Sequence, residues 1–508
     1  MIKNNDNDKN YTFDDNESLQ DLFKTISRIE RDEVNYIDND GNDQDDLEMM
    51  VEKEYQTLKR VQVPYTFHKN RFIDQPKTNN TIVASSLQYN TVYASRLEKL
   101  RPILLQQVEQ KYSEITIQKI LHLKPNDECV MIGTLYKEMD LKQNILKQYA
   151  QDRAILPPPA QRDSFIGEGD KLFFEDETGR VKLIADKQVV DSLLTGMNVA
   201  IKGKGLLGAE FEIEEVFYPG LPPQPHSKDL ENLEDDVYVC LVSGLSIGDP
   251  NNTLQLNMLV DYISGNLGTS KDQKFISRIS RLIIAGNSIF KEEQSHQSFM
   301  KYLSKQEINS KKQKMAIPIK EFDSILSELA KSIPIDIIPG PNDPTNSSLP
   351  QLPLNYCLFP FSVQNTNTNP TSNPYESQIG GRLFLGTAGQ NIDNASRYMI
   401  IDSKMDLTEK TLNWRHLAPT APDTLSCSAV DHDPFVIEQC PHVYFIGNQE
   451  KYQTKMIRGP NDQIIRIVLL PKFSESNTIV LVNLKTLDTF PIEFNCTTFF
   501  PQSPCSSS

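Results

Sequence analysis

Four short apolar runs, each followed by a glycine, set the pattern of the C-terminal half of the chain. With the residues that follow them, they are Asp236–Gly248 (DVYVCLVSGLSIG), Arg281–Asn287 (RLIIAGN), Ile335–Asp343 (IDIIPGPND) and His442–Glu450 (HVYFIGNQE). Such runs are typical of strands buried within an α/β sheet. Ligand sites of α/β proteins lie in the loops at the carboxyl ends of these strands. We therefore expect all four loops to converge on one site.

Helical and strand patterns alternate between these runs. Apolar positions repeat every three or four residues in segments that predict helices at Thr253–Ile263, Glu321–Ser332 and Asp406–Leu417. Further along, Ile464–Leu470 and Thr478–Leu484 are separated by PKFSESN. This pattern predicts a hairpin at the edge of a second sheet.

Two stacked sheets covered by helices form a four-layer α/β sandwich. We assign this fold to residues 236–500, with another strand at Arg382–Gly386. Residues 291–314 are rich in Lys, Gln, Glu and Ser, and we expect them to be a polar insertion. The only tryptophan, Trp414, falls in a predicted helix and is expected in the core.

Residues 124–220 change to a strand pattern. The predicted strands are Cys129–Tyr136, Lys171–Phe174, Val181–Ala185, Asn198–Lys202 and Phe211–Phe217. A turn-rich DETG sequence separates the second strand from the third, and a short helix precedes the fourth. Five strands with one helix in this order predict a closed barrel of the OB type.

OB barrels bind single-stranded nucleic acid through exposed aromatic side chains and basic grooves. The barrel aromatics Phe173, Phe174, Phe211 and Phe217 fall within the strand patterns. We interpret them mainly as core residues. Stacking on a ligand and a protein-binding surface remain alternatives.

The flanking segments differ in composition from both domains. Residues 1–52 are rich in Asn and Asp and are predicted to be disordered, since they can bury little apolar surface. Residues 53–123 form an extension with helices, in which Pro102 is expected to start a second helix. Residues 221–235 are predicted to be a linker, and residues 501–508 a flexible C-terminus.

The net charge of the 508-residue chain is −16, and −10 of it lies in residues 1–50. The rest is nearly neutral, which argues against an electrostatic trap for nucleic acid. None of the seven cysteines forms a CxxC pair, so we interpret them as reduced structural thiols. The acidic, polar N-terminus is unlike a signal peptide, so a nuclear or cytosolic protein is expected.

The four glycine-bearing loops resemble those of calcineurin-like metallophosphoesterases, which carry DxH, GD, GNHD and GHxH motifs. Two-metal sites of this kind polarise a phosphoryl group and generate hydroxide. This chain departs from the pattern in every loop. The positions that stand where the ligands are expected are Gly244, Ser246, Asn287, Pro341, Asn342, Asp343, Asn448 and Glu450. Because two carboxylates cannot hold two divalent cations, we predict no catalytic residues, no metal and no cofactor.

Five longer motifs carry a second resemblance. They are PGPNDPTNSSLPQLPLNYCLFP (Pro339–Pro360), NPYESQIGGRLFLGTAGQNIDNASRY (Asn373–Tyr398), RHLAPTAPDTL (Arg415–Leu425), DPFVIEQCPHVYFIGNQ (Asp433–Gln449) and MIRGPNDQ (Met456–Gln463). Together with an OB barrel ahead of a degenerate phosphoesterase fold, they resemble the B subunits of replicative DNA polymerases, those of polymerase delta above all. The resemblance covers roughly residues 85–500.

The resemblance implies a nuclear, non-catalytic scaffold. Its partners would be the cysteine-rich C-terminal domain of the polymerase delta catalytic subunit, a third subunit with a PCNA-binding motif, and possibly a small fourth subunit. DNA would be contacted only through the complex. The alternatives are an active metal-dependent phosphodiesterase or nuclease, a single-strand binder acting through the barrel, and the small subunit of another replicative polymerase.

Overall fold

The computed structural model of the chain describes most of the two predicted domains. The described residues are 59–69, 71–73, 88–112, 115–142, 162–225, 236–291, 305–428 and 430–494, with only the backbone of 305–315. The predicted acidic tail and flexible C-terminus, and most of the predicted linker, lie outside these ranges. None of the described helices is long and apolar enough to cross a bilayer.

The N-terminal domain is a closed five-stranded barrel with strand order β2-β3-β4-β6-β5. Its elements are β2 (Glu128–Glu138), β3 (Lys171–Glu175), β4 (Arg180–Ile184), α4 (Lys187–Ser192), β5 (Asn198–Leu206) and β6 (Glu210–Phe217), preceded by the 3₁₀ turn η2 (Ile120–His122). Phe174, Phe211 and Phe217 are buried, as their strand pattern predicted. The OB-type barrel is confirmed.

The C-terminal domain contains two six-stranded mixed sheets. One has the order β10-β9-β8-β7-β16-β17, with β7 to β10 parallel. Its strands are β7 (Tyr238–Val242), β8 (Ile279–Ala285), β9 (Ile335–Ile338), β10 (Thr368–Pro370), β16 (Thr478–Asn483) and β17 (Thr489–Glu493). Three of the four buried apolar runs predicted from sequence therefore form the parallel strands β7, β8 and β9 of this sheet, and the fourth lies in the other sheet.

The other sheet has the order β1-β11-β12-β13-β15-β14. Its strands are β1 (Tyr65–Phe67), β11 (Tyr375–Ile379), β12 (Arg382–Thr387), β13 (Val443–Gln449), β14 (Gln453–Arg458) and β15 (Ile464–Pro471). Here the predicted hairpin of residues 464–484 is wrong. Strand β15 pairs with β13 and β14, whereas β16 pairs with β7 and β17 in the facing sheet. The short α10 (Phe473–Ser476) carries the chain from one sheet to the other.

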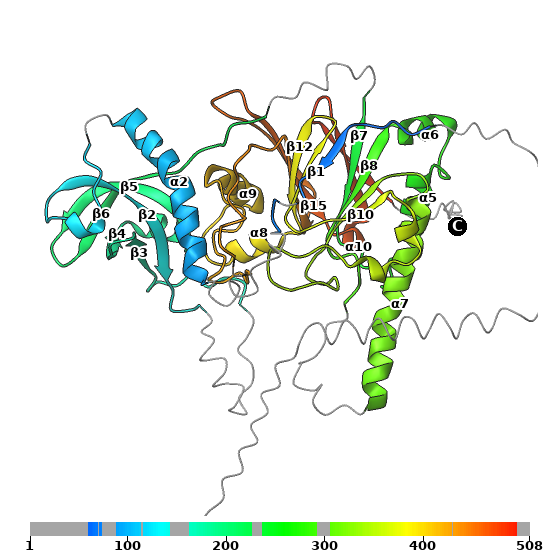
Figure 1. Ribbon diagram of the computed structural model, residues 1–508, viewed down its shortest axis with the longest axis horizontal. Helices are drawn as coiled ribbons and strands as arrows, with labels where there is room; N and C mark the ends of the chain where they lie inside the picture. Colours follow the sequence, from blue (N-terminus) through cyan, green and yellow to red (C-terminus); the bar gives the residue numbers. More distant parts are fainter. Residues whose placement is uncertain are drawn as a thin grey trace, which may run out of the picture.

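Helices cover both outer faces, so the sandwich has four layers (Figure 1). One face carries α5 (Thr253–Ser264), α6 (Ser270–Ile276) and α7 (Lys305–Leu329), and the other α8 (Gln390–Ala395) and α9 (Lys404–Asn413). Inward-facing residues such as Leu241, Ile283 and Phe445 form a separate core between the sheets. The predicted four-layer class is confirmed.

Two helix predictions need correction. Pro102 does not start a second helix, because α2 (Tyr89–Lys111) continues through it. Pro102 is exposed, so its ring faces solvent and only one helical hydrogen bond is lost. The predicted polar insertion of residues 291–314 is partly helical, because α7 begins at Lys305. Lys, Gln and Glu are good helix formers, and this favours the extra turns.

The segment before the barrel is bound to the sandwich. The Arg60 guanidinium donates hydrogen bonds to four backbone carbonyls that lie at or just beyond the ends of the covering helices, those of Ile263, Ile276, Ile279 and Ser332, at 2.6–3.0 Å. Five residues further on, β1 adds an edge strand beside β11. Residues 59–69, at the start of the extension that was predicted to contain helices, are therefore extended and lie against the C-terminal domain.

Helix α2 lies between barrel and sandwich (Figure 1). Its fully buried Arg96 donates through Nε to Asp433 Oδ2 at 2.5 Å. The same guanidinium donates to the carbonyl of Gly196 in the barrel at 2.7 Å, and to those of Pro419 and Ala421 in the sandwich at 2.9 and 2.7 Å. One side chain thus connects both domains. We call the Arg96–Asp433 pair, its carbonyl partners and His416 the joint.

The charges of the joint are well defined. His416 Nδ1 accepts from the backbone N–H of Ala418 at 3.1 Å, so Nε2 carries the proton donated to Asp433 at 2.9 Å. Burial, and then the nearby Arg96, lower the pKa of His416 to about 4. Burial alone would raise the pKa of Asp433, but Arg96 and His416 hold it below its usual value. At neutral pH His416 is therefore uncharged, and Arg96 and Asp433 form an ion pair.

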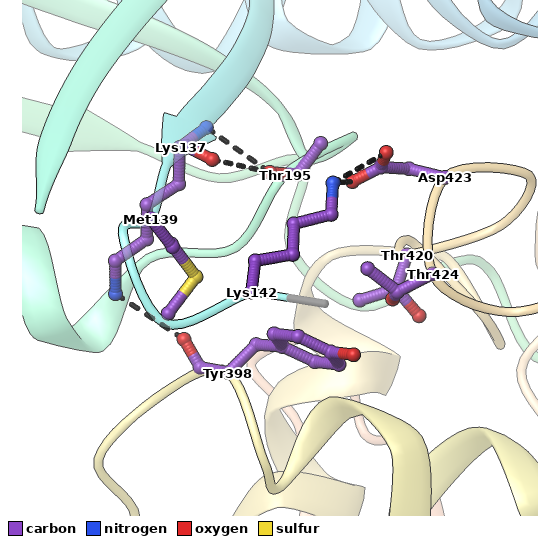
Figure 2. Close-up of a pocket in the computed structure, with 8 residues that line it drawn as sticks. All are labelled: Lys137, Met139, Lys142, Thr195, Tyr398, Thr420, Asp423 and Thr424. Carbon is purple, nitrogen blue, oxygen red and sulfur yellow. Dashed lines mark hydrogen bonds and ion pairs between the residues drawn. The ribbon is translucent and has the colours of Figure 1, made fainter. Parts of the chain in front are cut away.

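A small hollow lies beside the joint, at the same domain boundary (Figure 2). Lys142 spans it, and its Nζ contacts both carboxylate oxygens of Asp423 at 2.6 and 2.7 Å. Buried Lys137 donates to the carbonyl of Tyr398 at 3.2 Å. These contacts again connect a barrel strand or its following turn to the sandwich.

Candidate functional site

The four glycine-bearing strand ends meet at one place, as expected. Within one sheet, the backbone N–H of Gly244 donates to the carbonyl of Gly286 at 2.9 Å. From the facing sheet, Asn448 Nδ2 donates to the carbonyl of Ala285 at 3.2 Å. We call Gly244–Ser246, Gly286–Asn287, Gly340–Asp343 and Gly447–Glu450 together the four-loop site.

Backbone conformation at this site is unusual. Gly244 and Gly286 have φ of +64° and +82°, and the non-glycine residues Ser246, Asn287 and Asn448 have φ of +46°, +53° and +58°. Non-glycine residues seldom adopt this region, and such strain is concentrated at functional sites. The turns of a ligand site are therefore present in the backbone.

The fourth element differs from the prediction, because Gly447, Asn448 and Gln449 belong to strand β13 rather than to a loop. The strand shifts register against β15 between Ile446 and Gln449. A Cβ on Gly447 would lie 2.4 Å from the carbonyl oxygen of Ala285. Glycine is needed here because the two sheets approach closely, and the shift turns Asn448 toward the other loops.

Asp343 is the one buried carboxylate of the four-loop site. Its Oδ2 accepts from the N–H of Gly340 at 2.7 Å, and its Oδ1 from the N–H of Ile289 at 3.1 Å. Burial raises the pKa of Asp343 to about 6, although backbone hydrogen bonds oppose the shift. Both oxygens are thus engaged in holding two loops together.

The asparagines also contact backbone groups, although the Oδ1 of Asn448 is buried without a hydrogen-bond partner among the described residues. Asn287 Oδ1 accepts from the N–H of Asn342 at 3.1 Å. Asn448 Nδ2 donates to the carbonyls of Ala285 and Ala388, and its backbone N–H donates to Ser243 Oγ at 2.9 Å. Groups at the positions of metal ligands therefore act as neutral connections between strands.

The remaining predicted positions do not enter the interior of the site. Pro341 is exposed, and half-buried Ser246 contributes its backbone N–H to the carbonyl of Asn287 at 3.1 Å. The Glu450 side chain is 83% exposed, and its Oε1 lies 3.6 Å from Lys404 Nζ. Glu450 is therefore a surface residue next to the site.

A neighbouring amide network was missed in the sequence. Asn373 Nδ2 donates to Gln351 Oε1 and Gln390 Oε1 at 2.8 and 2.9 Å, and Gln390 Nε2 donates to Gln351 at 2.8 Å. Gln351 in turn donates to the carbonyl of Gly340 at 3.2 Å. These three residues lie in two of the long motifs. Amide side chains placed between apolar residues there were the sequence signal that could have predicted the network.

This arrangement offers little to a divalent cation. Among the described residues, no group of three or more His, Cys, Asp or Glu side chains is placed to hold a metal ion. The buried His442 accepts from the N–H of Leu383 at 3.1 Å, and burial lowers its pKa to about 4. His442 therefore has a structural role in holding Leu383. Neutral amides are weak ligands compared with the carboxylates and imidazoles of two-metal sites.

Two neighbouring rings on the described part of the barrel surface could stack on single-stranded nucleic acid. Phe173 and Tyr136 are cross-strand partners and half-buried. The guanidinium of Arg180 lies 4.0 Å from the centre of the Phe173 ring and 4.6 Å from that of Tyr136, and it also contacts Glu175. Because Arg180 occupies these rings and is itself paired, the barrel offers no open aromatic surface there for bases.

Two family models match the chain, one in each domain. The family model described as DNA polymerase delta subunit OB-fold domain matches residues 88–216. The model that describes the B subunit of DNA polymerase alpha/epsilon matches residues 239–455. The first corresponds to α2 and the barrel, and the second to the sandwich through β14.

Relatives in several organisms match most of the chain. The DNA polymerase delta small subunit of Arabidopsis thaliana is 41% identical over 80% of this chain and 91% of its own. The Oryza sativa small subunit is 39% identical over 80% and 93%, and that of Saccharomyces cerevisiae 31% over 79% and 88%. With the barrel, the sandwich and the four-loop site in place, these identities show that the chain belongs to the family of DNA polymerase delta small subunits, the accessory B subunits of a replicative polymerase.

Proposed function

We propose that this chain is a non-catalytic scaffold. It would hold the C-terminal domain of the polymerase delta catalytic subunit and a third, clamp-interacting subunit in one complex in the nucleus. The observation that carries the proposal is the four-loop site, where Asp343 and Asn448 bind backbone groups of their own chain. Asp343 accepts with both of its oxygens, and the other buried side chains of the site are neutral, so the site lacks the charged ligands that grip two cations for phosphoryl transfer.

A second observation supports a rigid body. Arg96 donates to carbonyls of both domains, and Lys142 pairs with Asp423 across the same boundary. A fused barrel and sandwich can present faces at a fixed separation, which is what a connector of two other subunits requires. We expect the catalytic subunit to dock mainly on the sandwich.

Co-expression tests the proposal directly. The full chain, carrying an affinity tag, is produced with the catalytic subunit and the third subunit of its own organism. We expect all three to elute together in stoichiometric amounts, and a fluorescent fusion to accumulate in the nucleus. A tagged chain that elutes alone under mild salt would contradict the proposal.

A further inference from the structure

Residues 59–69, which we call the strap, lie on the sandwich in the way that a bound peptide lies on a sheet. They run from α6 to β1 before the chain enters the barrel (Figure 1). Val61, Val63, Tyr65 and Phe67 are half-buried and pack against the core between the sheets, whereas the residues between them are exposed. Peptides that add a strand to a sheet present alternate side chains to it in this manner.

The first anchor of the strap is a guanidinium group. Three of the carbonyls that accept from Arg60 lie in the last turn of α5, at the last residue of α6 and just beyond α7. The carbonyl ends of helices carry partial negative charge, so three ends that meet at one side chain form a cation site. The planar guanidinium can donate to several of these carbonyls at once, which an ammonium group matches poorly.

The second anchor is a tyrosine five residues further on. Tyr65 Oη donates to Oδ1 of the buried Asp336 at 3.0 Å and accepts from Asn369 Nδ2 at 2.9 Å. The guanidinium of Arg281 lies 3.4 Å from the centre of the Tyr65 ring, which is a cation–π contact. The sandwich therefore recognises both the hydroxyl and the ring.

Main-chain hydrogen bonds join the strap to an edge of the sandwich. Strand β1 pairs antiparallel with β11 and is the last strand of that sheet. On either side of β1, the carbonyl of Pro64 accepts from the N–H of Gly380 at 2.8 Å, and the N–H of His68 donates to the carbonyl of Glu376 at 3.2 Å. In strand addition such bonds give affinity, and the side-chain contacts give specificity.

The partners of both anchors are also held by contacts that do not involve the strap. Asp336 accepts from Arg281 Nη1 at 2.7 Å and from Tyr375 Oη at 2.6 Å, and Ser377 Oγ donates to the same tyrosine oxygen. The helix ends around Arg60 rest on the apolar core beneath α5, α6 and α7. An incoming peptide therefore meets partners that are already in place, and little ordering free energy is lost.

From these contacts we infer that the sandwich has a binding site for an extended peptide with arginine and tyrosine five residues apart, and that the chain's own strap occupies it. The strap is a ligand carried on the same chain, and the sandwich folds without it. The site is separate from the four-loop site. Arg281 and Asp336 lie near the start of β8 and β9, whereas the four-loop site lies where these strands end.

Cutting the chain after the strap tests the inference. A protease site is placed within residues 78–84 of the full chain, between the strap and α2, and the purified protein is cleaved. We expect the fragment with the strap to stay with the remaining chain in gel filtration. Arg60→Ala with Tyr65→Ala should release the fragment, because both anchors are lost. The matched control is Thr66→Ala, which changes an exposed residue of β1 and should leave the fragment bound.

The remaining chain, released from the double variant, presents an empty site. It is titrated with a fluorescent peptide of residues 57–69, and we expect saturable binding. Peptides with Arg60→Lys or Tyr65→Phe should each bind about 10-fold more weakly, because each loses hydrogen bonds to the sandwich. The Thr66→Ala peptide should bind like the wild-type peptide.

Four results would overturn the inference. A wild-type fragment that separates would show that the strap is held only by its covalent attachment. Equal retention of the double variant would show that Arg60 and Tyr65 are not the anchors. Unfolding of the remaining chain after release, measured by circular dichroism, would make the strap part of the folding unit of the sandwich. A folded remaining chain that does not bind the peptide would show that no such site exists. Co-elution with the polymerase subunits, which tests the proposed function, is a separate measurement.

Discussion

The four-loop site and the joint are both buried polar regions of one chain, but they use charge in opposite ways. At the joint, Arg96 and Asp433 form a fully buried ion pair supported by carbonyls from two domains. At the four-loop site the connections are made by Asn287, Asn448 and a single carboxylate, Asp343.

Burying a charge costs free energy unless it is paired and hydrogen-bonded. An enzyme accepts this cost at its catalytic centre, where strained turns and charged ligands occur together. Here the strained turns remain at the four-loop site, while the buried ion pair lies between the domains. The comparison indicates that this molecule is built to keep its two domains in a fixed relation.

Removing the joint arginine should have the largest effect. Arg96→Met leaves Asp433 buried without its ion-pair partner and several carbonyls without a donor, so we expect a loss of about 3–5 kcal/mol in the free energy of unfolding. Urea titration of the full chain measures it. The control, Lys99→Ala on the same helix, breaks a partly exposed pair with Glu438 and should cost less than about 1 kcal/mol. Equal losses in both variants would show that the buried ion pair of the joint contributes no more to stability than a surface pair.

Mild acid should destabilise the chain through its buried histidines. The folded-state pKa values of His416 and His442 are lowered from 6.5 to about 4, so their contribution is complete above pH 6.5 and declines as the pH falls toward 4. At pH 5, proton linkage at each of these two histidines should lower the free energy of unfolding by about 2 kcal/mol relative to neutral pH. Asp343 acts in the opposite direction, because its raised pKa makes the folded state take up a proton, and it offsets about 1 kcal/mol.

His442→Gln sharpens this prediction, since its amide oxygen can still accept from Leu383. Unfolding free energies at pH 7.5 and pH 5 should differ by about 2 kcal/mol less in the variant than in the wild type. The same pH dependence in both proteins would mean that His442 does not titrate in this range.

Restoring two family-type ligands should harm the fold without creating an enzyme. In Gly244→Asp with Ser246→His, the Cβ at 244 would lie 2.9 Å from Lys472 Cβ and 3.0 Å from Asn448 Oδ1, at a φ of +64°. We expect a loss of about 1–3 kcal/mol, because this backbone conformation disfavours side chains. Hydrolysis of a chromogenic phosphodiester with Mn²⁺ should stay at background, and measurable turnover would refute the idea. Ser246→His alone is the control for stability.

The smallest change is expected at the site's own carboxylate. Asp343→Asn removes one acceptor for the backbone N–H groups of Gly340 and Ile289, but it also removes the buried charge that the raised pKa shows to be unfavourable. The two effects offset each other, so the free energy of unfolding at pH 7.5 should change by less than about 1 kcal/mol. Binding to the catalytic subunit should be unchanged in a pull-down. Loss of assembly with an intact fold would give Asp343 a role beyond holding its loops.

Much of the fold could be predicted because its strands are continuous apolar runs. The barrel and the centres of both sheets followed from residues such as Val237–Val242 and Phe211–Phe217. The hairpin at residues 464–484 failed for a physical reason. Two neighbouring apolar runs look alike whether they pair with each other or enter facing sheets. Strand β1 was missed because three residues cannot show an alternating pattern.

The joint was also missed, although the sequence held a signal. Arg96 stands in the row Val92, Arg96, Leu100, Leu104, Val108, in which every fourth residue is buried. A lone arginine within an apolar helix row predicts either a solvated break or a buried ion pair, and its partner Asp433 is 337 residues away. Only the folded chain decides between them. For the four-loop site, the sequence showed which ligands were missing but not that Asn448 and Asp343 bind backbone groups.

The central claim is that the four-loop site connects strands and does not hold cations. It is tested most directly by the metal content of the full-length chain, purified without chelators and dialysed against Mn²⁺. We predict that elemental mass spectrometry finds no stoichiometric Mn, Fe or Zn. About two metal ions per chain, the complement of a two-metal phosphoesterase, would contradict the account.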